Sequence, residues 1–213
     1  MTVPFPEPTT SAGSRTEVFL RYLGYFRDQL AARLRALPAA ELRRSIVPSG
    51  WTPLELLRHL TYVERRWLEW GFEGRAVGDP WGDQRDGRWY VGPDETVESL
   101  TAALRARAER TTAIIEAHDL AETGQPGPRW DGADPATLER ILFHLLQEYA
   151  RHIGHLDVVV EIATGRSGEL FFIERALVRA PRRATTPPPH ARQRDEPGLS
   201  PRSNEVEPGF HPV

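Results

Sequence analysis

Apolar residues recur at intervals of three and four along four stretches of the chain, which is the period of an amphipathic helix. The stretches cover residues 14–37, 52–72, roughly 94–118, and from about 134 to 165. In the first of them the apolar positions are Val18, Phe19, Tyr22, Leu23, Phe26, Leu30 and Leu34. No run alternates between apolar and polar residues for long enough to indicate a strand. The pattern therefore predicts an all-α protein.

Residues that favour helix ends support these boundaries. Ser14 is placed to cap the first helix, which must stop before Pro38. Thr52, Pro53 and Glu55 combine a capping threonine, a proline at the first helical position and a glutamate at the third. For the fourth helix, the Asp-Pro pair at residues 134–135 suggests a start of the same kind.

The segments between the helices suggest how the chain is divided. Residues 73–93 are rich in Gly, Asp, Arg and Trp and show no helical period, and a loop of this length is usually functional or disordered. The predicted fold is a four-helix bundle with a long crossover between the second and third helices. We expect a flexible arm over residues 1–13, the bundle over residues 14–180, and a disordered Pro/Arg-rich tail over residues 181–213. Within the bundle, residues 167–180 could form a short helix or lie across the others.

Composition excludes several kinds of chemistry. The chain has no cysteine and no lysine, which excludes disulfides, thiolate ligands, cysteine nucleophiles and lysine Schiff bases. A net charge of −3 argues against a nucleic-acid binder. No apolar run approaches the roughly 20 residues that span a bilayer, and residues 1–15 do not resemble a secretory signal. We therefore expect a soluble, cytoplasmic protein without a nucleic-acid or membrane partner.

The fourth predicted helix carries four polar residues at helical spacing. His144, Glu148, His152 and His155 are separated by four, four and three positions, so they fall within an arc of about 80°. The apolar stripe of the same helix overlaps this arc. Three histidines and a glutamate at the edge of a core are unfavourable unless they are hydrogen-bonded, paired or bound to a metal.

The second helix offers a further ligand, His59, on the apolar face that the bundle should bury. Together, Glu148, His152 and His59 would supply three of the ligands that a divalent ion needs and leave one position open, as in a reactive metal site. The alternative is that these residues only pack and hydrogen-bond. Single histidines on apolar helix faces usually do so, and Glu and His four residues apart often form an ordinary surface pair.

Two segments carry a resemblance to a known family. They read WTPLELLRHL over residues 51–60 and QEYARHIGHLD over residues 147–157. Over about residues 14–165 the chain resembles the DinB/YfiT-like metal-binding bundles. In that family one metal ligand is a histidine of the second helix. The other two ligands lie on the last core helix, where a His or Glu is followed four positions later by a His. The matching positions are His59, Glu148 and His152. With a glutamate at the first position of the pair on the last helix, the chain resembles the mycothiol-dependent branch of the family, which includes maleylpyruvate isomerase.

The resemblance implies a zinc or similar divalent ion whose open position receives a low-molecular-weight thiol, here mycothiol. Such an ion lowers the pKa of the thiol and presents a thiolate to a small electrophile, a nucleophile that this chain does not contain. The isomerase has an additional C-terminal domain, and its lack of a counterpart here argues against isomerase activity itself. His155 stands where many relatives have glutamine, so His155 and the neighbouring His144 are candidates for outer hydrogen-bonding partners or alternative ligands.

Other residues have less specific interpretations. Trp81, Trp89 and Tyr90 of the crossover could form an apolar lid over the site or simply cover the end of the bundle. Asp79, Asp83 and Asp86 lack the spacing of a calcium-binding loop, so we interpret them as solvated loop residues. Arg58 and Arg151 each precede a proposed ligand and could bind an acidic thiol or a substrate carboxylate, but we interpret them as solvated helix-face residues.

Three functions remain open at this level. The first is a metal-dependent thiol-transfer enzyme acting on a small electrophile. The second is a non-catalytic bundle that binds a metal or a small molecule in stress response or regulation. In the third, the polar stripe serves only packing or dimer formation. A homodimer through helix faces fits the scaffold, but the sequence does not determine the oligomeric state.

Overall fold

The structure is a computed structural model that describes residues 5–166. Four long helices form most of this part of the protein. They are α1 (Arg15–Ala36), α2 (Pro53–Glu64), α3 (Val97–Ala117) and α4 (Leu138–Thr164). A π-helix, η1 (Arg65–Phe72), continues α2, and a single 3₁₀ turn, η2 (Pro128–Trp130), precedes α4. Our predictions for residues 167–180 and for the tail at 181–213 lie outside the described residues.

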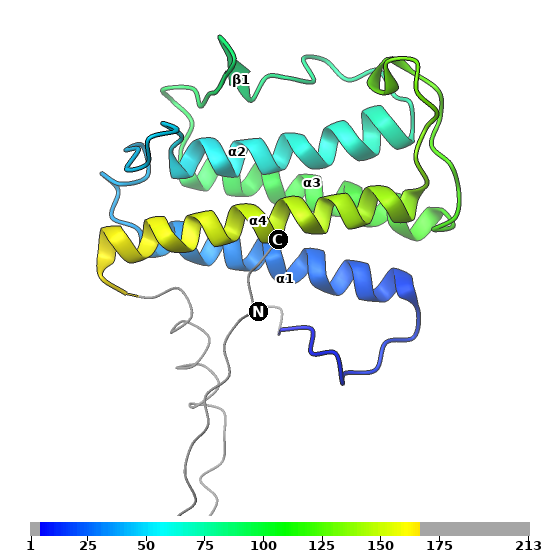
Figure 1. Cartoon of the computed structure of the whole chain (residues 1–213), viewed down its shortest axis with the longest axis horizontal. Helices are drawn as coiled ribbons and strands as arrows, with labels where there is room; N and C mark the ends of the chain where they lie inside the picture. Colours follow the sequence, from blue (N-terminus) through cyan, green and yellow to red (C-terminus); the bar gives the residue numbers. More distant parts are fainter. Residues whose placement is uncertain (1–4, 167–213) are drawn as a thin grey trace, which may run out of the picture. The chain divides into compact units, whose positions relative to one another are not determined.

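The helices pack as a bundle around one apolar core. α1 packs against α3 and α4, and α2 packs against the same two helices. The crossover after η1 returns along the bundle above α2, so that α2 and α3 run in the same direction (Figure 1). This arrangement confirms the prediction of a four-helix bundle with a long second connection. Within residues 5–166, no helix is long and apolar enough to cross a membrane.

The first two helices begin where the sequence predicts. The Ser14 hydroxyl accepts a hydrogen bond from the backbone N–H of Glu17. Thr52 and Glu55 form the predicted reciprocal capping box at the start of α2, with proline at the first helical position. Caps of this kind stabilise a helix by about 1 kcal/mol each.

The starts of the other two helices were predicted too early. α3 begins after Thr96, which forms a capping box with Ser99, and α4 begins after Thr137 instead of near residue 134. The physical reason for the second error is a backbone pairing across the linker. Thr137 forms an antiparallel bridge with Thr123, and the Ala136 carbonyl accepts a hydrogen bond from the N–H of Gly124 at 3.0 Å. This pairing holds residues 136 and 137 extended.

One polar network connects all four helices inside the core. Glu64 of α2 is completely buried and accepts hydrogen bonds from Arg27 of α1 at 2.8 Å, Thr111 of α3 at 2.6 Å and Tyr149 of α4 at 2.5 Å. Burial alone would raise the pKa of Glu64, but the Arg27 charge and these hydrogen bonds outweigh it and lower the pKa. The carboxylate is therefore ionised, and a buried charge of this kind fixes the relative positions of its partners.

The crossover contains a small hairpin that the sequence analysis missed. Strands β1 (Gln84–Arg85) and β2 (Arg88–Trp89) pair in antiparallel fashion. Asp86 and Gly87 connect them with φ angles of 52° and 73°, the left-handed conformations of a type I′ turn, for which Asp-Gly is a favoured dipeptide. The backbone N–H of Tyr90 then donates to the carbonyl of Asp83 at 2.8 Å, so the residues that flank the strands are also held.

Candidate metal centre

Two helices bring the three predicted ligands together. His59 comes from α2, while Glu148 and His152 lie one turn apart on α4. The Oε2 atom of Glu148 is 3.8 Å from Nε2 of His59 and 3.3 Å from Nε2 of His152, and one ligand atom from each residue lies within 4.8 Å of the others. Tetrahedral coordination with bonds near 2.1 Å separates ligand atoms by about 3.4 Å. The three side chains are therefore spaced as ligands of one ion could be.

His59 is oriented by a buried carboxylate. Its Nδ1 atom lies 3.0 Å from Oδ2 of Asp83, whose other oxygen accepts a hydrogen bond from Arg66 at 2.5 Å. Asp83 is 0% exposed, so the interpretation of this residue as a solvated loop residue was wrong. The reason is that Arg66 of η1 and His59 together supply the positive charge and donors that the buried carboxylate needs. The contact places the imidazole proton on Nδ1 and leaves Nε2 free to bind a cation.

The neighbouring histidines decide the charge state of Glu148. The imidazoles of His152 and His59 beside the carboxylate hold the pKa of Glu148 far below its ordinary value, although partial burial acts in the opposite direction. The glutamate is therefore ionised, which is the form that binds a metal.

The donor set fits a divalent cation such as zinc. Two imidazole nitrogens and one carboxylate form a common three-ligand set for zinc, and His59 has the outer carboxylate partner that such ligands usually have. His152 differs, because its Nδ1 atom is buried and makes no hydrogen bond within residues 5–166. The orientation of His152 therefore depends on packing against its neighbours.

Aromatic rings enclose the three candidate ligands. Trp89 of the hairpin stacks on His59 with 4.1 Å between ring centroids and meets His152 edge-on at 5.2 Å. Trp51, just before α2, lies 6.3 Å from Trp89 and 6.5 Å from His155. These rings exclude water from one side of the site and strengthen electrostatic interactions there.

The two additional histidines flank the ligands on α4. His155 is exposed, and its ring lies 5.6 Å from that of His152. His144 is closer to the other end of the site, with Nε2 at 3.7 Å from Oε1 of Glu148 and its ring against Trp67 at 4.6 Å. Partial burial lowers the pKa of both histidines, so each is predominantly neutral near pH 7. Neutral imidazoles can accept protons or act as alternative ligands.

The remaining candidates lie at different distances from the ligands. Of the three proposed lid residues, Trp89 touches His59, Tyr90 lines a cavity beside it, and Trp81 packs against Trp70 and Arg66 with 45% of its surface exposed. Arg58 is not solvated as we expected. It donates to Glu95 at 2.6 Å and to the carbonyl of Tyr90 at 3.4 Å, because the crossover folds back over α2.

Sequence reasoning missed Asp83, Arg66 and Trp51 as parts of the site. One signal could have located the first of them. Asp86 and Gly87 lie between short runs of residues that can pair as strands, and this pattern indicates a two-residue hairpin. Such a hairpin places Asp83 and Trp89 close together at its open end.

The fold and these side chains define a class of protein, a four-helix bundle with a His/Glu/His group that could hold a metal ion between two of its helices. The model of the Mycothiol-S-transferase family, a DinB/YfiT-like family, matches residues 18–165. The chain belongs to this family. No curated protein matches the chain significantly.

Proposed function

We propose that the protein is a metal-dependent transferase that joins mycothiol to a small electrophile. The observation that carries the proposal is the convergence of His59, Glu148 and His152 in a chain of the Mycothiol-S-transferase family. In the overall reaction the sulfur of the thiol forms a bond to carbon, and the thiol proton leaves with the displaced group as HX. The chain has no cysteine, so the attacking sulfur comes from the cosubstrate.

His59, Glu148 and His152 would hold the ion, for which zinc is the best match among the common divalent metals. When bound, the ion would lower the pKa of the thiol and so supply a thiolate at neutral pH. The other residues have supporting roles. Asp83 keeps the proton of His59 on Nδ1, and Trp89 covers one face of the same ring. The hairpin thereby orients a ligand and keeps water from the reacting sulfur.

The test begins with the metal content of the full chain purified without a histidine tag. Mass spectrometry should find about one ion per chain in the wild type. His59→Ala and His152→Ala should lose the ion, whereas His118→Ala should keep it. His118 is the matched control because it pairs with Glu122 at the far end of α3.

The second step is a conjugation assay with mycothiol and monochlorobimane, a fluorogenic electrophile. We expect turnover in the wild type and in His118→Ala, and loss of turnover in His152→Ala while its circular dichroism remains that of a folded bundle. Metal binding without turnover across a panel of electrophiles would favour a non-catalytic binding role. Turnover that survives both the loss of the metal and His152→Ala would exclude the mechanism.

A further inference from the structure

Arg129 is a half-buried arginine of η2 that has no acidic partner in the described part of the chain. Its Nε atom is buried and makes no hydrogen bond there, and its guanidinium forms no ion pair. Arg58 and Arg107 also have a buried Nε atom without a partner. Their guanidinium groups, however, pair with Glu95 and Glu69. Arg129 therefore lacks the counter-charge that a half-buried cation normally has.

Packing against η1 holds the side chain of Arg129 in place. Its guanidinium carbon lies 3.9 Å from the centre of the Trp67 ring and 6.0 Å from that of Trp70. The aliphatic stem lies over Gly71, where an added Cβ atom would be 3.4 Å from Cγ of Arg129. The next residue, Trp130, donates from its ring nitrogen to the carbonyl of Gly71 at 3.2 Å. The guanidinium is thus held on an aromatic face, a contact that leaves its N–H groups available to a ligand.

The stacked guanidinium lies close to the candidate metal centre. The ring of Trp67 also meets that of His144, with 4.6 Å between the centroids. The Nε2 atom of His144 is in turn 3.7 Å from Oε1 of the candidate ligand Glu148. The side chains of His144 and Glu148 are 35% and 20% exposed. A small molecule can therefore reach this end of the site from solvent.

The acidic groups of the site have other partners. Asp83 accepts a hydrogen bond from Arg66 at 2.5 Å, and Glu148 faces the two candidate histidine ligands. Burial and the neighbouring charge of Arg66 both lower the pKa of Arg129, but an arginine stays charged at neutral pH. An anion bound at this guanidinium would therefore come from a ligand.

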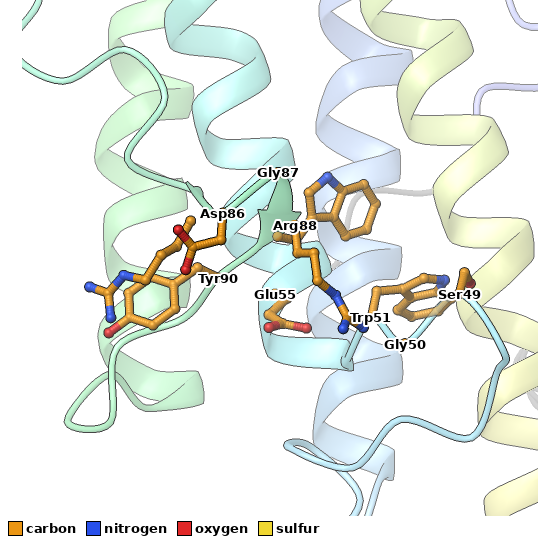
Figure 2. A pocket seen from close by; sticks show the side chains of 10 residues that line it. Ser49, Gly50, Trp51, Glu55, Asp86, Gly87, Arg88 and Tyr90 are labelled. Carbon is orange, nitrogen blue, oxygen red and sulfur yellow. The ribbon is translucent and has the colours of Figure 1, made fainter.

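The arginines of the neighbouring cavity are in a different situation. This cavity of about 500 Å³ lies between the turn before α2 and the hairpin (Figure 2). Two arginines and two carboxylates are among its lining residues, and both arginines are exposed: Arg85, Arg88, Glu55 and Asp86. Arg129 is not among the lining residues. The unpaired charge beside Trp67 is a separate feature, at the end of the ligand set nearer the start of α4.

The surroundings of Arg129 indicate what kind of anion it would bind. A guanidinium matches a carboxylate through two parallel N–H···O bonds. The single positive charge suits a monoanion better than a phosphate dianion. Trp67 and Trp70 add half-buried indole surface beside the guanidinium, and such rings pack well against planar apolar groups. These features favour a carboxylate attached to a flat apolar group.

We propose that Arg129 binds a carboxylate of the electrophile, so that planar compounds with a carboxylate are preferred substrates. The inference rests on the proposed function, which supplies the transfer reaction. The guanidinium would hold the carboxylate while the reactive carbon points towards the three candidate metal ligands. The sulfur of the thiol then forms a bond to this carbon, and the bond from the carbon to the leaving group breaks. The leaving group takes the electron pair and departs with the thiol proton as HX, and the carboxylate is unchanged.

A binding measurement tests this site without the reaction. The probes are 4-methylbenzoate and 4-methylbenzamide, which have nearly the same shape, differ in charge and do not react with thiols. Each is titrated into the zinc-loaded full chain and followed by ligand-observed NMR. We expect the benzoate to bind, and Arg129→Gln to weaken its binding about tenfold. The control Arg140→Ala, at an exposed arginine of α4, should bind the benzoate like the wild type.

The amide probe separates charge recognition from packing. It should bind more weakly than the benzoate and respond to neither variant. Three results would overturn the inference: no binding of the benzoate, binding that Arg129→Gln leaves unchanged (direct binding to zinc included), or equal weakening of both probes by Arg129→Gln. The last result would mean that the side chain only supports the packing of Trp67.

A kinetic comparison then uses 4-(chloromethyl)benzoate and 4-(chloromethyl)benzamide with mycothiol. After subtraction of the uncatalysed rates, kcat/KM should be about tenfold higher for the acid, and Arg129→Gln should abolish this preference. Binding of 4-methylbenzoate through Arg129 without turnover of either chloride would support the carboxylate site and contradict the transferase function. Turnover of both chlorides with equal kcat/KM would support the transferase and overturn the role of Arg129.

Discussion

Replacing Asp83 with asparagine tests whether the hairpin controls metal binding. The carboxylate faces Nδ1 of His59 at 3.0 Å and Arg66 at 2.5 Å, and it has no access to water. The asparagine side chain would have nearly the same size but no negative charge, and its amide could present an N–H to Nδ1. The proton of His59 would then no longer be held on Nδ1, and Nε2 would be a poorer ligand.

The expected loss of zinc affinity follows from the role of a carboxylate that orients a ligating histidine. Loss of a partner that orients a ligating histidine lowers metal affinity by about 10- to 100-fold, or about 1.4–2.7 kcal/mol. The assay is competition for zinc between the protein and a chromophoric chelator at neutral pH. We expect Asp83→Asn to bind zinc at least about tenfold more weakly than the wild type.

A second variant separates this effect from general destabilisation. Arg66→Met removes the buried ion pair but leaves Asp83 to orient His59. Breaking one side of a buried pair lowers the free energy of unfolding by about 3 kcal/mol, and both variants should show this loss in urea unfolding of the metal-free protein. Only Asp83→Asn should then lose zinc affinity. Equal zinc affinities for Asp83→Asn and the wild type, or equal losses in the two variants, would refute the proposed role of Asp83.

Two further predictions concern stability. Glu64→Gln should lower the free energy of unfolding by about 3–5 kcal/mol in urea titrations, because it leaves the buried Arg27 without its counter-charge. The pKa of Glu64 is lower in the folded chain than in the unfolded one. Its stabilising effect is therefore complete above the ordinary carboxyl pKa and declines as the pH falls through the folded pKa. Glu64→Gln should accordingly reduce the slope of stability against pH below about pH 4, and an unchanged slope would contradict this assignment. Thr52→Ala removes one half of the capping box of α2 and should cost about 1 kcal/mol, whereas Thr9→Ala, at an exposed position before α1, should change the unfolding midpoint little.

The helices and the candidate ligands could be predicted because both depend on local periodicity. The spacing of apolar residues identified all four helices, and the same 3.6-residue period placed Glu148 and His152 on one face. The apolar neighbours of His59 then indicated that it faces the same core. These predictions needed only the geometry of single helices and the rule that apolar faces pack together.

The features that the sequence did not reveal depend on contacts between distant segments. The start of α4 is set by its pairing with residues 120–124. Asp83 resembles any loop aspartate until the crossover folds and brings it to His59 and Arg66. The π-helix at residues 65–72 has the same apolar pattern as an α-helix continued over these residues. For the start of α4 and for Asp83, the residues that determine the structure are far away in the sequence. For the π-helix, the sequence pattern differs too little from that of an α-helix.

The three candidate metal ligands and the cavity beside Trp89 depend on different parts of the chain. The separation of His59 from Glu148 follows from the packing of α2 against α4. The hydrogen bond from Tyr149 to Glu64 holds these two helices together close to the candidate ligands. Glu64 lies five residues after His59, and Tyr149 directly follows Glu148. The shape of the adjacent cavity follows instead from the hairpin, which rests on the helices through Asp83 and Trp89. Substitutions at residues 85–88 should therefore change the lining of this cavity, while the buried network keeps the three candidate metal ligands in place.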